Sequence, residues 1–492
     1  MSSSVTSGLR GPAQEPHNRQ RHINLLPPEV LSYLFILCEY ANKPTWSVRN
    51  ISMGGHSSPF YQKTLPAVCS YWRSVALDTP ALWSRVTLSD SPPFDLSALY
   101  LSRSGTEAPL DIEIRITDKH WGYSDSWRPE VHQALPFIIT HGGVTSRWRS
   151  CWIQTNDLPA HLAVLNFLMS SHLPILQYLE LDYCGPEYTS RRFESGVYSN
   201  FLSTRSLFHD PPIPRLRSAV LRSVPNLCLF RDMSLVQLTE LTYFELDFCA
   251  PLPKLEQLNG LLAACPRLTA LLIDSMLEFH FGNDPDRLDE PIELPRVRLP
   301  MLQSLALKHA IRSNVHWELG LLKMIDAPNV QSLQLYLASN RAFDSDAIIE
   351  YITQGDSAIS PGPIFPLLTS LGFFVQTDIT VDLRRLLSTY TMVNTLVLPE
   401  FPELTALLET PLLAPELALL SLETKEYSVL KRLVILRRDA RMPLKSVELK
   451  KQTYIWEISP EEEEELKELV DLVLVDELED RMFSMLRGDM CI

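Results

Sequence analysis

Ten segments of the chain repeat one pattern of proline and leucine, and this pattern restricts the fold more than any other feature of the sequence. Its full form, Pro-x-Leu-x-x-Leu-x-Leu, lies at 174–181, 300–307 and 415–422. Substituted copies lie at 214–221, 238–246, 266–273, 328–335, 366–373, 391–398 and 442–449. Successive copies begin about 23 to 40 residues apart, and self-similarity at such a period is typical of stacked repeat architectures.

Each copy predicts the same small unit of structure. The Leu-x-Leu end alternates like a short strand, the proline marks the turn before it, and the residues between copies leave room for a helix and loops. One unit cannot bury its own apolar side, so neighbouring units must stack. We therefore predict an α/β fold in which residues 91–458 form an irregular, degenerate leucine-rich-repeat solenoid. Its exposed concave positions are suited to binding a macromolecule. The alternative is that these leucines form the core of another kind of α/β domain.

Segments outside the ten copies also carry local signals. The apolar residues of 96–101 predict a short helix, the strict alternation of 110–116 predicts a strand, and 148–153 suggests another. Ser459, Pro460 and Glu461 have the order of a helix start. We expect residues 459–492 to contain an acidic helix that caps the last repeat, with an acidic docking tail as the alternative. Residues 472–475 fit a helix or a strand equally well.

Composition limits the possible partners and compartments. The formal net charge is −15 and no Lys- or Arg-rich run occurs, so nucleic acid is not expected as a partner. The eight cysteines are scattered without a C-x-x-C pair, as in proteins of reducing compartments. No apolar run approaches the roughly 20 residues that cross a bilayer. Residues 1–21 read as a polar, disordered tail without a secretory signal. We expect an intracellular protein of the cytoplasm or nucleus, with no membrane as partner.

The stretch from Asn24 to Leu88 predicts a small helical module. Two prolines suit a helix start at 27–28. Apolar residues then follow at helical spacing from Val30 to Cys38. A second apolar segment runs from Leu65 to Leu77, and a short third piece contains Leu82 and Trp83. Three short helices cannot bury all these side chains among themselves, which indicates a partner.

This stretch resembles an F-box, and more narrowly the F-box-like proteins of mushroom-forming fungi. The resemblance rests on Leu26-Pro27-x-Glu29-Val30, Leu34-Phe35, Val68-Cys69-x-x-Trp72-Arg73-x-x-Ala76 and Leu82-Trp83, in that order. It covers residues 22–90, about a fifth of the chain. One departure is an insertion of about 42–63, rich in Gly, Ser, Asn and Pro, where many F-boxes are much shorter.

The resemblance implies that this chain is the substrate receptor of a Skp–cullin–F-box ubiquitin ligase. The F-box would dock on a Skp-type adaptor, and through it on a cullin, while the solenoid holds an unknown target protein. The adaptor-facing residues carried over by position are Leu26, Pro27, Val30, Leu31, Leu34, Phe35, Val68 and Trp72. Which of these contact the adaptor, and which pack inside the module, stays open at this point. Such a receptor supplies proximity rather than bond-making, so we expect no catalytic residue, cofactor or metal.

Three other interpretations remain. The helical module could be a cap on the solenoid. The protein could be a non-catalytic scaffold that binds a Skp-type adaptor without directing ubiquitination. An enzymatic site could be built around His120, His132 and His141 with Asp118 and Asp125, although their spacing matches no zinc pattern and surface histidines are the simpler interpretation.

Overall fold

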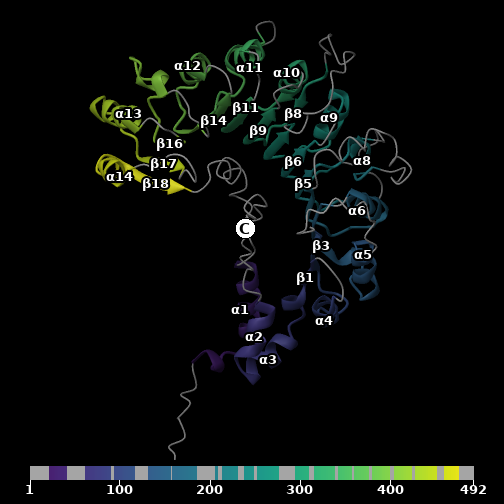
Figure 1. Cartoon of the computed structure of the whole chain (residues 1–492). Coiled ribbons are helices and arrows are strands. Elements are labelled where there is room, and N and C mark those ends of the chain that lie inside the picture. The colour runs from purple at the N-terminus through teal and green to yellow at the C-terminus, as the bar shows by residue number, and fades with distance from the viewer. Residues whose placement is uncertain are drawn as a thin grey trace, which may run out of the picture.

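A parallel sheet of 14 strands dominates the structure, which is a computed structural model. It describes residues 22–41, 61–89, 94–116, 131–156, 158–184, 206–208, 213–230, 238–248, 252–275, 294–309, 315–337, 342–356, 360–375, 379–398, 404–423, 427–450 and 459–475. The strands follow one another in chain order from β1 to β18, and every neighbouring pair is parallel. The protein is therefore of the mixed α/β class, and its sheet curves into an open arch (Figure 1).

The strands of this sheet are short, as expected for one strand per repeat unit. They are β1 (Arg85–Ser89), β2 (Leu110–Ile116), β3 (Trp148–Thr155), β4 (Tyr178–Tyr183), β5 (Ser218–Arg222), β6 (Tyr243–Asp247), β7 (Ala270–Asp274), β9 (Ser304–His309), β11 (Ser332–Leu337), β14 (Ser370–Val375), β15 (Thr395–Leu398), β16 (Leu419–Leu422), β17 (Ser446–Lys450) and β18 (Asp471–Val475). Two further two-stranded sheets pair β8 (Val297–Arg298) with β10 (Ile325–Asp326), and β12 (Gly355–Asp356) with β13 (Ser360–Pro361).

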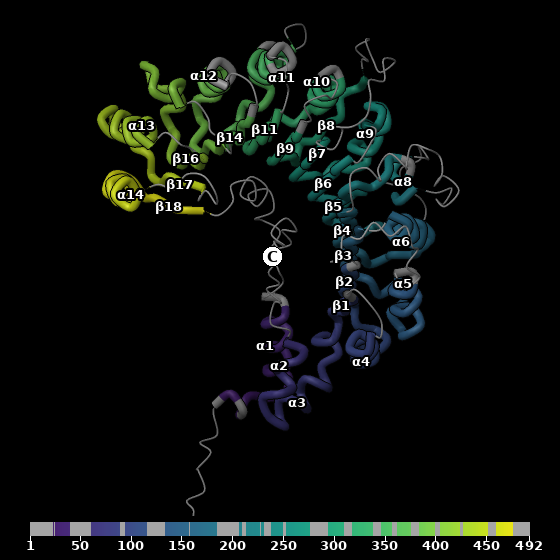
Figure 2. The backbone as a smooth tube through the Cα atoms, viewed as in Figure 1, coloured from purple at the N-terminus to yellow at the C-terminus, as the bar shows by residue number. Residues whose placement is uncertain are grey.

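Helices connect the strands and cover the outer side of the arch (Figures 1 and 2). They are α4 (Asp95–Arg103), α5 (Val131–Thr140), η4 (Thr145–Arg147), α6 (Leu158–Ser170), α8 (Asn226–Phe230), α9 (Leu255–Ala263), α10 (Val315–Met324), α11 (Ala342–Gln354), α12 (Ile379–Thr389), η7 (Leu404–Leu408), α13 (Tyr427–Asp439) and α14 (Pro460–Lys467). Helices on one side of a parallel sheet are the expected result of strand–helix–strand crossovers.

Side chains alternate strictly between the two sides of the sheet. In register across the first strands, Val86, Ile112 and Cys151 face the helices and are fully buried. The neighbouring row, which begins with Thr87 and Glu113, faces the inside of the arch. One continuous hydrophobic core extends from Leu31 in the first helix to Val470 before the last strand.

The ten strands predicted from the proline–leucine pattern are all present, from β4 to β17. The strands predicted at 110–116 and 148–153 are present as β2 and β3, and the helix predicted at 96–101 is α4. The sheet extends beyond the expected range of 91–458, because β1 precedes it and β18 follows it. Residues 472–475, which fitted either structure, are part of β18.

The N-terminal module has five helical segments, two more than the sequence predicts. It contains η1 (His22–Leu25), α1 (Pro28–Ala41), α2 (Tyr61–Val68), α3 (Ser70–Leu77) and η3 (Pro80–Trp83). The second apolar segment was expected as one helix, but the chain is extended at Cys69, whose sulfur accepts the N–H of Trp72 and starts α3. The expected tail at 1–21 and residues 42–60 of the insertion lie outside the described residues.

The predicted acidic helix near the C-terminus is α14. Ser459 is its N-cap, Pro460 occupies its first turn, and Glu462 completes a capping box with Ser459 at 3.1 and 3.2 Å. Leu466 is fully buried below the helix. The helix lies beside β18, which follows it in the chain as the last strand of the sheet (Figure 1); its role as a cap on the last repeat stays a prediction.

Candidate functional site

Exposed apolar side chains are concentrated in the N-terminal module. Of the fourteen large hydrophobic side chains that are exposed among the described residues, eight lie between residues 22 and 77. We call these eight the N-terminal apolar set: Ile23, Leu25, Val30, Tyr33, Leu34, Leu37, Val68 and Leu77. Monomeric proteins rarely expose such a concentration unless it binds something. The set is therefore the first candidate for an interaction surface.

Helix α1 divides its apolar residues between two sides. Leu31 and Phe35 point into the module, with 0% and 1% of their surface exposed, and Phe35 lies 5.1 Å from the ring of Trp72. Val30, Leu34 and Leu37 follow at helical intervals on a neighbouring side of the helix and are 44%, 36% and 43% exposed. The helical spacing of the sequence groups all five residues, whereas the structure separates an inner pair from an outer row.

The eight residues assigned to the adaptor from the sequence therefore fall into three groups. Leu31 and Phe35 are core residues and are not accessible to a partner, which corrects their assignment to a binding surface. Leu26 and Trp72 are half-buried; the carbonyl of Leu26 accepts a hydrogen bond of 2.7 Å from the Tyr71 hydroxyl. The accessible residues are Pro27, Val30, Leu34 and Val68. Tyr33 and Leu37 also belong to the exposed surface of α1. Neither was among the eight residues assigned to the adaptor from the sequence.

The module is joined to the sheet by buried contacts. Trp83 is fully buried; its indole N–H donates to the carbonyl of Ala76 at 2.7 Å, and its ring lies 5.5 Å from Tyr100 of α4. The guanidinium carbon of Arg103 lies 4.4 Å from the centre of the same ring. One tryptophan therefore contacts α3 and α4 together. The module and the first unit of the sheet form a single packed body.

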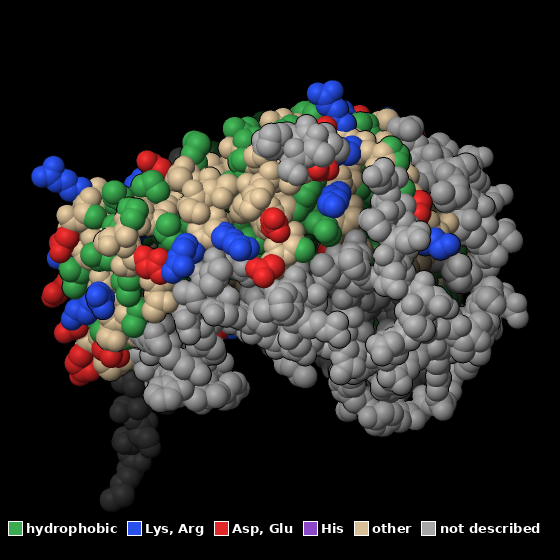
Figure 3. Space-filling view, turned by 90° about the horizontal axis from the view of Figure 1, so that it is seen from above, with side chains coloured by type: hydrophobic (Ala, Val, Ile, Leu, Met, Phe, Trp, Pro, Cys, Tyr) green, Lys and Arg blue, Asp and Glu red, His purple; other side chains and the backbone are tan. Residues whose placement is uncertain are grey.

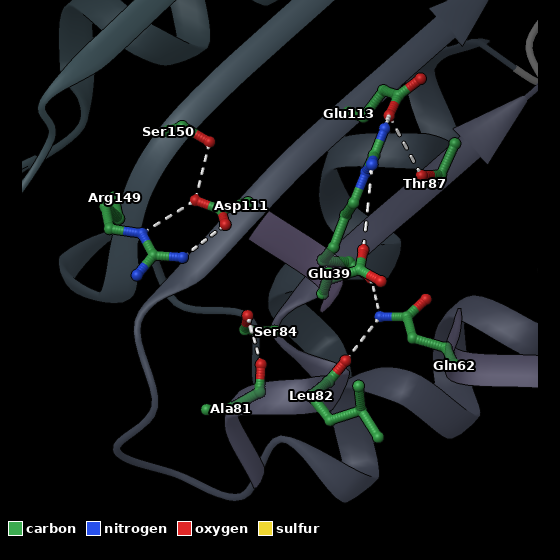
Figure 4. A network of polar contacts seen from close by, with 11 residues as sticks. Glu39, Gln62, Ala81, Leu82, Ser84, Thr87, Asp111, Glu113, Arg149 and Ser150 are labelled. Atoms are coloured by element: carbon green, nitrogen blue, oxygen red, sulfur yellow. Dashed lines mark hydrogen bonds and ion pairs between the residues drawn. The ribbon is translucent and has the colours of Figure 1, made fainter. Parts of the chain in front are cut away.

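A polar network reinforces this junction (Figure 4). Gln62 of α2 is 3% exposed, and its side-chain amide donates at 3.0 Å to the carbonyls of both Leu82 and Arg85. Arg85 forms an ion pair of 2.9 Å with Glu113 of β2 and lies 3.9 Å from Glu39 of α1. The module thus caps the first edge of the sheet, as the capping interpretation expects, and still leaves the N-terminal apolar set exposed.

The inner side of the arch has a buried charged cluster on β4, β5 and β6. Arg222 of β5 bonds to Glu180 of β4 at 2.6 Å and to Glu245 of β6 at 2.7 Å. The Tyr243 hydroxyl donates to Glu245 at 2.8 Å, and the Tyr178 hydroxyl donates to Glu180. Burial raises the pKa of Glu180, against the lowering effect of Arg222. Burial would lower the pKa of Arg222, but the carboxylates of Glu245 and Glu180 raise it well above its usual value.

The positions expected to be exposed on the concave face are in part buried. Six of them, in β5, β6, β7, β9 and β15, form a second and smaller hydrophobic cluster: Val220, Tyr243, Ala270, Leu272, Ala306 and Val397. Half-exposed side chains on this side occur along the whole sheet, such as Arg115 on β2, Tyr336 on β11 and Lys450 on β17. The expectation of a uniformly exposed inner face was wrong, because apolar residues at these positions pack against their neighbours across the strands.

The histidines proposed as an alternative enzymatic site are only partly described. His120, Asp118 and Asp125 lie outside the described residues, and His132 lies on α5. His141 is exposed and its ring contacts the carbonyl of Phe137 at 2.8 Å, which is a local helix-end contact. Among the described residues, no group of three or more His, Cys, Asp or Glu side chains is arranged to hold a metal ion.

Two further observations concern partners. No described helix has the length and apolar character needed to cross a membrane. Figure 3 looks down on the outer surface of the arch and shows Lys and Arg side chains mixed with Asp and Glu, without an extended patch of one sign among the described atoms of that view.

No protein-family model matches the sequence, and no curated protein matches it significantly.

Proposed function

We propose that this protein is a substrate receptor of a Skp–cullin–F-box ubiquitin ligase. The helical module at 22–90 would be its F-box, and the curved parallel sheet would be a degenerate leucine-rich-repeat solenoid that holds a target protein. The observation that carries the proposal is the N-terminal apolar set, because eight of the fourteen exposed large hydrophobic side chains of the described chain lie on this one module.

The separation of α1 into two sides supports a docking role. Leu31 and Phe35 stabilise the module from inside, so the outer row of Val30, Leu34 and Leu37 is not needed for its core. Exposed apolar residues that contribute little to folding are costly in water unless a partner covers them. A hydrophobic groove of the adaptor is the partner that the resemblance implies, and the outer row has the i, i+4, i+7 spacing with which helices enter such grooves.

The rigid junction supports a receptor rather than a flexible tether. Gln62, Arg85 and Trp83 connect the module to the sheet through buried hydrogen bonds and ring contacts. A target on the sheet would therefore keep a constant position relative to the adaptor. Ubiquitin transfer by proximity benefits from such a restricted geometry, since orientation lowers the entropic part of the barrier.

A pull-down of the co-expressed, tagged protein tests this proposal. We expect the Skp-type adaptor and the cullin to co-purify with the original chain and both to be lost from a Val30→Ala/Leu34→Ala/Leu37→Ala variant. The matched control is Met301→Ala/Leu367→Ala/Met392→Ala, which removes three apolar side chains that lie outside the module and are somewhat more exposed than the outer row. Absence of the adaptor from the original chain would refute the proposal.

The scaffold remains the second candidate, because the same apolar set would serve it equally well. In that case the adaptor co-purifies and the cullin does not. For a scaffold, substituting the outer row of α1 would leave the cellular level of the proteins that bind the sheet unchanged. For a receptor, the same substitution would make its target protein accumulate.

A further inference from the structure

The outward backbone groups at the two edges of the large sheet differ in their hydrogen bonding. From β5 to β17, the first residue of each strand directs its N–H toward the preceding strand; Ser446 N–H, for example, donates to the carbonyl of Ala418 at 3.1 Å, and Asp111 N–H of β2 donates in the same direction, to the carbonyl of Ser84 at 3.0 Å. On β1 this alternation directs the carbonyls of Arg85 and Thr87 outward. Both are bonded, since Gln62 donates to Arg85 at 3.0 Å and Ser97 of α4 donates to Thr87 at 2.8 Å. Side chains therefore bond two outward carbonyls of the first edge.

The last edge has no further strand beside it among the described residues. Strand β18 pairs with β17 in continuous register from Asp471 to Val475, and no other described strand neighbours it. The same alternation directs the backbone N–H and C=O groups of Leu472 and Leu474 away from β17. Within the described residues, no hydrogen bond reaches these outer groups. A row of unpaired backbone groups is a template for another strand.

Strand β18 also lacks the usual protection of an edge strand. Its sequence is Asp-Leu-Val-Leu-Val, without lysine, proline or a register shift, although proteins commonly use such features to prevent strand addition. Its four apolar residues are all half-exposed. An added strand could therefore continue the hydrophobic rows on both sides of the sheet.

The surroundings of this edge are acidic. Residues 459–475 contain the carboxylates of Glu461 to Glu465, Glu468 and Asp471, against the single cation Lys467. Two further cations lie nearby, and each is held in an ion pair: Lys431 of α13 with Glu465 at 2.6 Å, and Lys450 of β17 with Glu423 at 3.0 Å. Two copies that paired edge to edge would bring two such acidic helices together, which like charges oppose. A basic partner is attracted by the same field.

We propose that the outer edge of β18 binds an extended, basic segment of another protein by strand addition. The backbone of that segment would pair with Leu472 and Leu474, its alternating apolar side chains would extend the two faces, and its Lys or Arg residues would meet the carboxylates of α14 and Asp471. The inference stands independently of the F-box proposal, because it concerns the opposite end of the molecule.

Peptide binding to the full chain tests this inference. The probe is a synthetic peptide that alternates valine and threonine and has two lysines at each end, compared with the same peptide ending in glutamates. We expect the lysine peptide to bind more tightly than the glutamate peptide.

A pair of variants tests the backbone contact. Leu474→Pro removes an outward backbone N–H, whereas Leu474→Ala shortens the side chain and retains that N–H. Loss of one such hydrogen bond should weaken binding by about tenfold in the proline variant relative to the alanine variant.

Amide hydrogen exchange of the original chain provides a readout that needs no variant. Peptide addition should slow exchange at Leu472 and Leu474, which face outward, and leave the inward amide of Val473 unchanged. The inference is overturned if the original chain binds neither peptide or binds both equally. It is also overturned if the proline and alanine variants bind alike, or if the protein is a dimer that Leu474→Pro dissociates, because the occupant is then a second copy.

Discussion

The side-chain amide of Gln62 on α2 lies 3.0 Å from the backbone carbonyl of Arg85, the first residue of β1. This contact, with its companion to the carbonyl of Leu82, joins the helical module to the edge of the sheet. We predict that Gln62→Leu lowers the free energy of unfolding by about 1–3 kcal/mol, because it leaves two carbonyls buried without donors. Urea denaturation measures this, with the exposed Gln133→Leu on α5 as a control that should change little. An equal effect of both substitutions would contradict the role of Gln62.

The two sides of α1 should separate stability from binding. Phe35→Ala removes a buried ring and should destabilise the protein by about 3–5 kcal/mol. Leu34→Ala, one residue away, removes an exposed side chain and should change stability by less than about 0.5 kcal/mol. Thermal unfolding of both variants measures the difference. If Leu34→Ala destabilises as strongly as Phe35→Ala, the outer row is part of a core and not of a docking surface.

The buried cluster around Arg222 predicts a strongly non-additive response. Arg222→Met leaves the carboxylates of Glu180 and Glu245 buried without their cation and should cost about 3–5 kcal/mol of stability. Adding Glu180→Gln and Glu245→Gln removes those charges and should restore a large part of the loss. Chemical denaturation of the single and combined variants gives the coupling free energy between these side chains. Additive effects of the three substitutions would show that the ion pairs contribute independently.

His161 on α6 predicts a loss of stability in acid. It is fully buried, its Nδ1 lies 3.3 Å from the Thr155 hydroxyl, and burial lowers its pKa to about 3. The unfolded chain takes up a proton near pH 6.5 and the folded chain does not, so stability rises with pH between about 3 and 6.5 and is constant above. At pH 5 this side chain alone should cost about 2 kcal/mol relative to pH 7.5.

Urea denaturation across this pH range, with His161→Phe beside it, isolates the contribution. The phenylalanine variant should show a shallower slope below pH 6.5. His172→Gln, at an exposed position, should retain the original slope. A His161→Phe variant with an unchanged slope would mean that the acid sensitivity comes from other groups.

The strands were predictable because their signal repeats. The Leu-x-Leu positions of β4 to β17 are core residues, and a core with one strand per unit imposes the same spacing each time. Strand β1 was missed because Val86 and Leu88 lie directly after Trp83, within a stretch that otherwise reads as helical. The break at Cys69 was also missed, since nothing in the local apolar pattern distinguishes one long helix from two short ones that meet at a thiol cap.

The candidate site was only partly predictable for a different reason. Periodicity shows that Leu31, Leu34 and Phe35 lie on adjacent parts of a helix, but the direction of the core depends on where α3 and Trp72 pack. That information lies in contacts between segments far apart in the sequence. The hydrogen bonding of the first sheet edge by Gln62 and the position of Leu474 on the last edge likewise depend on contacts between segments, which composition does not reveal.

The most direct test of the receptor proposal is the affinity of the purified full chain for a purified Skp-type adaptor, measured by isothermal titration calorimetry. We expect saturable binding that Val30→Ala/Leu34→Ala/Leu37→Ala weakens by at least about 100-fold, since buried anchors typically contribute about 2 kcal/mol each. Met301→Ala/Leu367→Ala/Met392→Ala should bind like the original. If the original chain does not bind the adaptor, or if the two triple variants bind equally, the N-terminal apolar set is not a docking surface for that partner and the receptor proposal is wrong.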